Sequence, residues 1–340
     1  MSNSDVIAGM QPVTLATLQS TMKKPEERLM VQTIRDYMPF FDRAVFSTAS
    51  DGTRDVAKII TEYPEGQARG YNEGWDSEAA YGKQVAYETS MYRTRSPVDY
   101  DMYIHKGAKA AAWRAQEDQR FQLGMARAMV RRCFYGNRNE NGRDMLGLRN
   151  IVVPDEVWND RIINAGGTTA DKQAEFWVIN WREGDIHLTV PEGKEAPGLF
   201  MDVGNTPVYV PDKNGKEYRA LVSEMGWDLG ISVFNPLNIV RVTNIDTAKL
   251  SEKISSTGVP NLIKLLTMAL NRIQLDEGRA CIYMNENLLG WLQLQIQEKT
   301  NVQFNQKTIG DRLVDVWGTT PIYKLGNDVL SNTNPVLSFS

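Results

Sequence analysis

The feature that most constrains this chain is one uninterrupted helical pattern between Ala108 and Tyr135. The segment is rich in Ala, Gln, Arg and Met, contains no proline, and is followed by Gly136, a residue type that commonly ends helices. At 1.5 Å per residue it predicts roughly 40 Å of helix, enough to traverse a whole domain. Phe121, Met125 and Ala128 are spaced to form its apolar face.

The chain before this helix predicts an arm, a hairpin and a long loop. Residues Pro25–Tyr37 have the spacing of an amphipathic helix. Val45–Thr48 and Val56–Ile60 flank Asp51-Gly52, a dipeptide suited to tight turns, and together they predict a β-hairpin. Tyr63–Gly82 is broken by four glycines and is too long for an ordinary connection, which predicts a projecting loop.

A long strand is expected between this loop and the long helix. Within Val85–Ile104, apolar residues alternate at positions 98, 100, 102 and 104, and Pro97 interrupts the pattern. The first third of the chain is therefore expected to be an arm followed by a long two-stranded extension.

The remainder of the chain alternates between strand-like and helical patterns without regular βαβ units. The pattern predicts strands over about 176–245, a helix over 260–275, a strand over 280–284, a helix over 286–299 with Asn285 as its N-cap, and strands over 314–317 and 321–325. Together these segments predict an α+β fold without internal repeats.

Groups that carry catalysis are scarce in this sequence. The two histidines, His105 and His187, are distant from each other, and a structural role is favoured for both because metal and catalytic sites usually gather several such groups. Cys133 and Cys281 form no CxxC pair and are expected to be buried thiols. We therefore predict no catalytic residue, no cofactor-binding residue, no metal ligand, and no enzymatic activity.

The charge balance limits the range of partners. A formal net charge of -4 and a pI of about 5.5 disfavour a protein whose main task is to grip phosphate backbones. A local basic patch that touches nucleic acid without sequence preference stays open beside the alternative of cations at a helix C-terminus, for Arg131, Arg132, Arg138, Arg143 and Arg149. Trp177, Trp181 and Trp227 lie in strand-like segments, which favours core packing over base stacking.

No stretch of the sequence predicts a membrane span or an export signal. An apolar run of about 20 residues is needed to cross a bilayer, and none occurs. Residues 1–19 lack both the basic start and the apolar run of a signal peptide.

Five segments resemble, in sequence and in order, the major capsid proteins of short-tailed bacteriophages. They are Phe176–Gly193 (FWVINWREGDIHLTVPEG), Gly198–Gly204, Tyr218–Ala220, Trp227–Val233 and Arg241–Asp246. The resemblance implies the Hong Kong 97-type capsid fold, which consists of an N-terminal arm, an extended loop, a peripheral domain with a long spine helix, and an axial domain.

Each part of that fold has a candidate in this chain. The resemblance implies an arm over 1–45, an extended loop over 46–105, a peripheral domain over 106–175 with its spine helix at about 108–135, a mainly axial segment with peripheral strands over 176–310, and strands over 311–340 that return to the peripheral domain. Some members of the fold join subunits by isopeptide bonds, but no lysine, asparagine or acid of this sequence matches that chemistry.

The implied function is structural. The chain is expected to be a coat subunit that assembles with copies of itself, as hexamers and pentamers, into the icosahedral head of a tailed phage around double-stranded DNA. Scaffolding, decoration and portal proteins are the further partners implied, with nonspecific contact to DNA, assembly in the host cytoplasm and a final place in the virion. An encapsulin-like compartment and an α+β enzyme or binding protein remain the alternatives.

Overall fold

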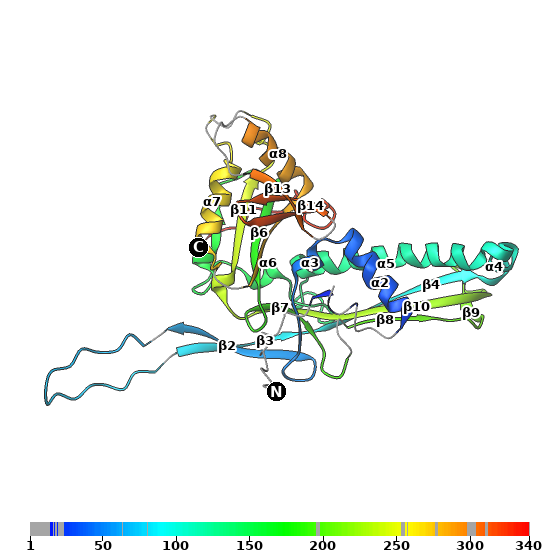
Figure 1. Ribbon diagram of the computed structural model, residues 1–340, viewed down its shortest axis with the longest axis horizontal. Helices are drawn as coiled ribbons and strands as arrows, with labels where there is room; N and C mark the ends of the chain where they lie inside the picture. Colours follow the sequence, from blue (N-terminus) through cyan, green and yellow to red (C-terminus); the bar gives the residue numbers. More distant parts are fainter. Residues whose placement is uncertain are drawn as a thin grey trace, which may run out of the picture.

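The computed structural model describes residues 14, 15, 17, 19, 24–62, 64–79, 81–194, 198–252, 256, 258–275, 278–297, 304–309 and 312–339 of the 340-residue chain. Figure 1 shows a body, a long limb on one side of it, and a hairpin that projects from the other side. The α-helices are α2 (Pro25–Tyr37), α3 (Phe40–Arg43), α4 (Tyr100–His105), α5 (Ala110–Tyr135), α6 (Leu148–Ile151), α7 (Leu262–Arg272) and α8 (Glu286–Gln297). The mixture of helix and sheet makes this an α+β fold, as predicted.

The limb is a six-stranded sheet with α5 lying along it. Its strands are β1 (Phe46–Thr48), β4 (Ser90–Asp99), β7 (Ile186–Val190), β8 (Leu199–Val203), β9 (Val208–Pro211) and β10 (Glu217–Val233). The 17-residue β10 is the central strand: β4 pairs along one edge, and β9, β8 and β7 share the other. Figure 1 shows α2 crossing α5 on the limb.

The body is a seven-stranded sheet that carries α7 and α8. In order across the sheet its strands are β13 (Phe304–Ile309), β14 (Arg312–Trp317), β15 (Thr320–Leu325), β12 (Arg279–Asn285), β6 (Gln173–Trp181), β11 (Ile239–Asp246) and β5 (Ile162–Asn164). The helices bury their apolar faces against this sheet, with Leu266 of α7 and Leu292 of α8 fully covered.

Strand β6 joins the two hydrophobic cores of the molecule. Alternate side chains of a strand point to opposite faces, and every residue of β6 is buried. Phe176 and Val178 pack in the core beneath α7 and α8, whereas Trp177, Ile179 and Trp181 pack in the core that extends into the limb. This alternation explains why the segment reads as a continuous apolar run.

An aromatic cluster, here called the hub, holds the limb to the body. It consists of Phe40, Phe134, Trp181 and Tyr283, and the ring centroids of the last three lie 5.4, 5.6 and 4.9 Å from that of Phe40. The Trp181 Nε1–H donates to the Tyr283 hydroxyl (2.9 Å), which donates to the Phe40 carbonyl (3.0 Å). Four segments that are far apart in sequence therefore meet in one buried cluster.

Most of the predicted helices and strands are confirmed with small changes in their ends. Helix α2 has the predicted bounds, and α8 ends at Gln297, with residues 298 and 299 outside the described part of the chain. Asn285 caps α8 as expected, because its Oδ1 accepts the Leu288 N–H at 2.8 Å. The three tryptophans of the β-rich middle are buried, as predicted.

The predicted hairpin between 45–48 and 56–60 is wrong. Its turn exists, with Gly52 at a φ of +59° and reciprocal backbone hydrogen bonds between Asp51 and Arg54. However, β1 runs parallel to β7, and the following strand, β2 (Arg54–Glu62), pairs with β3 (Tyr81–Glu88). Pairing with β7 buries Phe46 in the core, an advantage that local turn chemistry cannot reveal.

The predicted strand over 85–104 is three elements. Strand β3 is followed by β4, and the chain then enters α4 because the Asp99 carboxylate accepts the N–H groups of Asp101 and Met102. Met102 and Ile104 are exposed, so their period-two spacing with Val98 is coincidental.

The long helix is confirmed as α5, but its predicted apolar face is only partly confirmed, because Met125 is buried in the core and Phe121 is not. Phe121 is 36% exposed, while Arg114, Asp118 and Gln122 are buried. The polar side chains can be buried because Arg114 donates to the Ser223 hydroxyl (3.0 Å), which in turn donates to Asp118 (2.9 Å). Charged residues in the first half of α5 therefore face the sheet.

Candidate assembly surfaces

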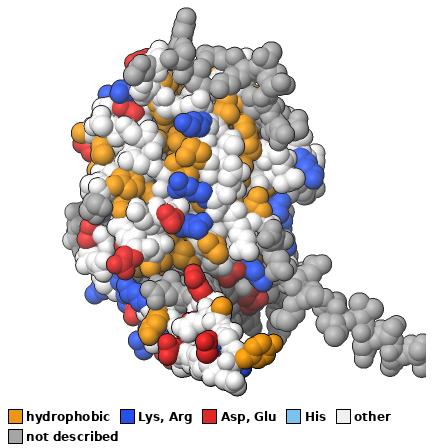
Figure 2. Space-filling model, turned by 90° about the vertical axis from the view of Figure 1, so that its left-hand side faces the viewer, with side chains coloured by type: hydrophobic (Ala, Val, Ile, Leu, Met, Phe, Trp, Pro, Cys, Tyr) orange, Lys and Arg blue, Asp and Glu red, His pale blue; other side chains and the backbone are white. Residues whose placement is uncertain are grey.

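The projecting hairpin ends in an exposed loop, Pro64–Ala79, as predicted for this stretch; Tyr63 and Ala80 lie outside the described residues. Tyr71 is 99% and Trp75 67% exposed, and the Arg69 guanidinium lies 4.9 Å from the Trp75 ring. In Figure 2, which views the molecule from the side of the loop, acidic and hydrophobic side chains gather at the lower end of this face. Exposed aromatic groups of this size are typical of protein interfaces.

The loop has no support from the body in the part of the chain that the structure describes. Its backbone N–H groups at Gly66 and Gly70 are bound by the loop's own Glu78 and Glu73, at 3.0 and 2.8 Å. Figure 1 shows it far from both sheets, pointing away from α5. A large aromatic side chain is ordinarily stabilised by burial of about 150–250 Å² of its surface. The aromatic side chains of the loop lack this burial within their own chain, so a partner can supply it.

A buried polar cluster fixes the base of the hairpin to the limb; we call it the hairpin clamp. The His187 Nε2 lies 2.7 Å from the Asp55 carboxylate, and the Thr189 hydroxyl donates to the same oxygen at 3.4 Å. Nearby, the Tyr87 hydroxyl donates to the Val233 carbonyl at 2.9 Å. Asp55, His187 and Tyr87 are all buried, so the hairpin leaves the limb at a defined angle.

Two opposing effects act on the Asp55 carboxyl. Burial alone would raise its pKa, but the hydrogen bond and charge of His187, with help from the Ser232 and Ser50 hydroxyls, bring its pKa below the ordinary 3.8. Asp55 is thus held as a carboxylate. His187 has the structural role that the sequence favoured, whereas His105 is exposed at the end of α4.

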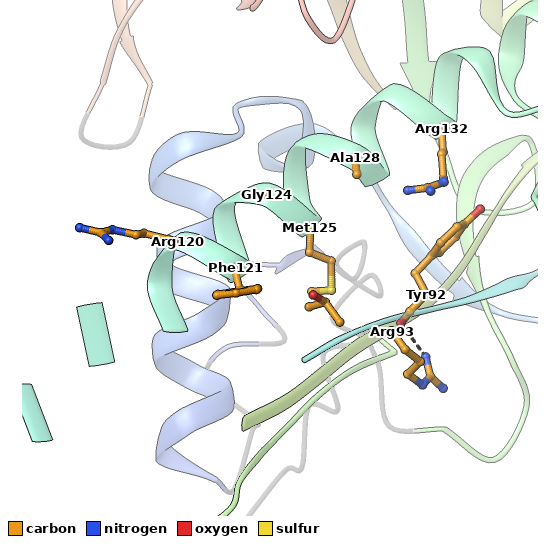
Figure 3. Close-up of a pocket in the computed structure, with 9 residues that line it drawn as sticks. Tyr92, Arg93, Arg120, Phe121, Gly124, Met125, Ala128 and Arg132 are labelled. Carbon is orange, nitrogen blue, oxygen red and sulfur yellow. Dashed lines mark hydrogen bonds between the residues drawn. The ribbon is translucent and has the colours of Figure 1, made fainter. Parts of the chain in front are cut away.

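A groove runs between α5 and the neighbouring strand β4, on the limb (Figure 3). This α5–β4 groove has a volume of about 460 Å³, and its lining comprises Tyr92, Arg93, Thr94, Arg120, Phe121, Gly124, Met125, Ala128 and Arg132. Figure 3 shows Phe121 and Met125 pointing from α5 toward the strand, while Arg120 points away along the surface. A β-carbon added at Gly124 would meet no atom within 4 Å, so the groove is open there.

Arginines surround this apolar groove. The Arg132 guanidinium lies 4.4 Å from the Tyr92 ring, and Arg93 forms an ion pair with the buried Asp228. From Gln119 to the end of α5 the sequence has four arginines and no acidic residue. Arg127 and Arg131 are exposed and form no ion pair with any described residue. The second half of α5 is therefore a cationic surface.

Three of the five arginines considered for a basic patch contact other groups of their own chain. Arg132 lies against Tyr92, Arg138 forms an ion pair with Glu88, and Arg149 donates to Asn334 at 2.8 Å. Three of the five are thus engaged by their own chain and serve the packing of the subunit.

Sequence reasoning did not identify the clamp or the groove. Asp55 and His187 are 132 residues apart, and no local pattern connects them. For Tyr92 and Arg93 the sequence predicts a strand and indicates no functional role. The usable signal was Gly124 within a long helix, where glycine costs about 1 kcal/mol relative to alanine and so invites a reason for its presence.

Chemical sites do not stand out among the described residues. No group of three or more His, Cys, Asp or Glu side chains is placed to hold a metal ion there. In the same part of the chain, no helix has the length and apolarity needed to cross a bilayer.

Comparison with known proteins shows which family and which solved structures this chain resembles. The family model for major capsid protein GP7 matches residues 25–337. A chain in the structure of bacteriophage Epsilon15 is 23% identical, with a TM-score of 0.62 and coverage of 87% of this chain and 88% of that one. The capsid of bacteriophage JBD30 is 9% identical, with a TM-score of 0.48 and coverage of 92% and 98%. No curated protein sequence matches.

The likeness to the Epsilon15 chain covers most of both chains, and the fold is the Hong Kong 97-type capsid fold. The family match spans most of the sequence, including all five segments that carried the resemblance. The chain therefore belongs to the major capsid protein GP7 family and is a structural subunit of a tailed-phage capsid.

Proposed function

We propose that copies of this subunit associate head to tail into hexamers and pentamers that tile an icosahedral head, with the projecting hairpin of each subunit reaching over its neighbour. The observation that carries this proposal is the exposed loop with Tyr71 and Trp75 at the end of a firmly clamped hairpin. An aromatic tip on a fixed arm can gain its burial only from another molecule.

The same proposal assigns the two large sheets to different domains of the capsid subunit. The limb, with α5 as spine helix, is the peripheral domain, and the seven-stranded sheet with α7 and α8 is the axial domain. The segment 176–310 then contributes to both, because β7 to β10 lie in the limb. Of the last residues, β14 and β15 belong to the axial sheet, and the stretch near Ser331 returns to the spine helix, where its N–H is bound by the Tyr135 hydroxyl.

Further partners follow from a closed DNA-containing shell. We propose scaffolding, decoration and portal proteins as transient or fixed neighbours, and nonspecific contact of exposed arginines with packaged double-stranded DNA. Assembly takes place in the host cytoplasm. The net charge of -4 limits the DNA contact to local patches.

The test is to express the full chain, alone and with the neighbouring genes, and to measure mass by size-exclusion chromatography with light scattering and shape by electron microscopy. We expect rings or closed shells of many copies. A stable monomer under every one of these conditions would overturn the proposal.

A paired variant separates the loop from general folding. Replacing both loop aromatics, Tyr71→Ser with Trp75→Ser, should leave a folded subunit that no longer assembles, because both side chains are exposed in the single chain. Ser77→Ala in the same loop is the matched control and should assemble normally. Normal assembly of the aromatic-free loop would show that the hairpin tip is not a contact.

A further inference from the structure

We propose that the side chains of Arg43, Arg279 and Tyr323 form a binding site for a single phosphate group, at the edge of the hub where the limb meets the body. This site, here called the anion site, goes beyond the proposed assembly because it concerns a ligand of the single subunit. The phosphate group can belong to a free inorganic ion or to the backbone of packaged DNA, since both present the same oxygens.

Three elements that pack together position the anion site. Arg43 is the last residue of α3, which lies at the junction of limb and body (Figure 1) and packs on β12. Alternate residues of a strand share a face, so Arg279, the first residue of β12, lies in one row with Cys281 and Tyr283. Tyr323 of β15 lies beside Tyr283, with ring centroids 6.0 Å apart. The row of β12 therefore brings Arg279 to the side of the sheet that α3 covers.

The three side chains are hydrogen-bond donors that lack acceptors in the described part of the chain. The Arg43 Nε–H donates to the Tyr323 hydroxyl at 3.3 Å, which leaves the hydroxyl hydrogen and both terminal nitrogens of Arg43 without a described partner. Arg279 forms no hydrogen bond or ion pair with another described residue. The Tyr323 side chain is only 3% exposed, and a buried donor without an acceptor costs about 1–3 kcal/mol. An oxyanion, which only accepts, satisfies all three groups at once.

The charge of the cluster favours an anion over a neutral acceptor. Arg43 and Arg279 are both partly buried. Burial lowers the pKa of the Arg279 guanidinium, and the neighbouring charge of Arg43 lowers it further, although an arginine stays protonated at neutral pH. Asp42 adjoins Arg43 and has an interaction of its own. Two arginines against this one acid leave an excess positive charge among the described residues, and a bound anion removes the cost of holding like charges together.

The donor set suits phosphate in particular. The planar guanidinium group of arginine can donate two parallel hydrogen bonds to phosphate oxygens, and such charge-assisted bonds are roughly twice as strong as neutral ones. Three donor groups from three elements match the several oxygens of a tetrahedral phosphate. Because α3 leads into β1 of the limb, whereas β12 and β15 belong to the body, a bound phosphate links the two parts of the subunit.

Thermal melting of the full chain tests the site, with millimolar inorganic phosphate compared against chloride at equal ionic strength. A ligand that binds only the folded state stabilises it by mass action. Phosphate at about ten times its Kd should lower the unfolding equilibrium constant about tenfold and raise the melting temperature by about 2 °C. Higher concentrations are avoided because phosphate excluded from protein surfaces stabilises folded proteins in general.

Variants of the donors separate binding from folding. Arg279→Gln should abolish the phosphate shift and melt no lower than the unchanged protein in chloride, because Arg279 has no described partner to lose. Tyr323→Phe keeps the ring and removes the hydroxyl, so it should reduce the shift. The matched control is Arg127→Gln, which removes an exposed arginine of α5 and should keep the full shift.

A duplex oligonucleotide without terminal phosphates distinguishes the two sources of the phosphate group. If the duplex raises the melting temperature of the unchanged protein and not that of Arg279→Gln, the site binds the DNA backbone; if only inorganic phosphate does so, the site holds the free ion. An equal phosphate shift in the unchanged protein and in Arg279→Gln would overturn the site. No shift in either would overturn it too, and would indicate that Asp276 or Glu277, which lie outside the described residues, already neutralises the arginines.

Discussion

The hub and the tip of the hairpin are both rich in aromatic residues, yet they stand in opposite surroundings. In the hub, Phe134 and Trp181 have no exposed surface and each touches other rings. At the tip, Tyr71 and Trp75 lie in solvent. Burial within the chain stabilises the subunit, whereas apolar surface left outside is available for association. The same residue types thus contribute to folding in one region and to assembly in the other.

The largest effect should come from removing the tip. Replacing residues 64–79 with a short Gly-Ser turn should abolish assembly and leave melting nearly unchanged, because the entropy of loop closure varies slowly with length. Particle counts by electron microscopy and thermal melting of the subunit measure the two effects. An unfolded deletion variant would show that the tip belongs to the core and would break the comparison.

The hub should respond in the opposite sense. Phe134→Ala removes a fully buried ring and should cost about 3–5 kcal/mol of unfolding free energy, measured by denaturant titration. Trp75→Ala should change it by no more than about 0.5 kcal/mol. Since a loss of that size can unfold a marginal protein, Phe134→Leu supplies a milder hub variant. Equal stabilities for the hub and tip variants would contradict the division.

Features that depend on neighbouring residues could be predicted from the sequence, whereas features that depend on distant segments could not. The bounds of α2 and the Asn285 cap were predictable because the residues that decide them lie within one or two turns. The partner of β1 and the buried face of α5 depend on strands more than 90 residues away, so no local pattern contained them. The alternation of β6 between two cores was hidden because both of its faces are apolar.

The candidate surfaces were only partly predictable for the same reason. Glycines and charged residues marked 63–82 as a loop, since such residues cannot form a core of their own. The α5–β4 groove could not be predicted without knowing that β4 lies beside α5. The alternating pattern instead predicted a single strand that continued through residues 100–104, which form α4.

The clamp connects the two regions and should give an intermediate effect. Asp55 has a lowered pKa, so its carboxylate favours the folded state above about 3.8, and this contribution is lost as the pH falls through the still lower folded pKa. Asp55→Asn should cost about 1–3 kcal/mol at neutral pH, since it weakens a buried hydrogen bond to His187. In the variant, the melting temperature should also fall less between pH 5 and pH 3 than it does in the unchanged protein. An unchanged acid slope would show that the carboxylate does not anchor the hairpin.

The smallest effect is expected at the thiols, and it probes how tightly the hub is closed. Cys133 and Cys281 both lie in the hydrophobic core that contains the hub, where burial raises the pKa of each thiol to about 12. At neutral pH they are therefore protonated as well as inaccessible, and only the thiolate reacts readily. A disulfide reagent should label neither cysteine in the native subunit and both after unfolding, while Trp75→Cys at the tip should add one site that reacts at once. Native labelling of Cys133 at a rate close to that of the tip site would mean that the hub opens as freely as the loop, and the contrast between a folding core and an assembly arm would fail.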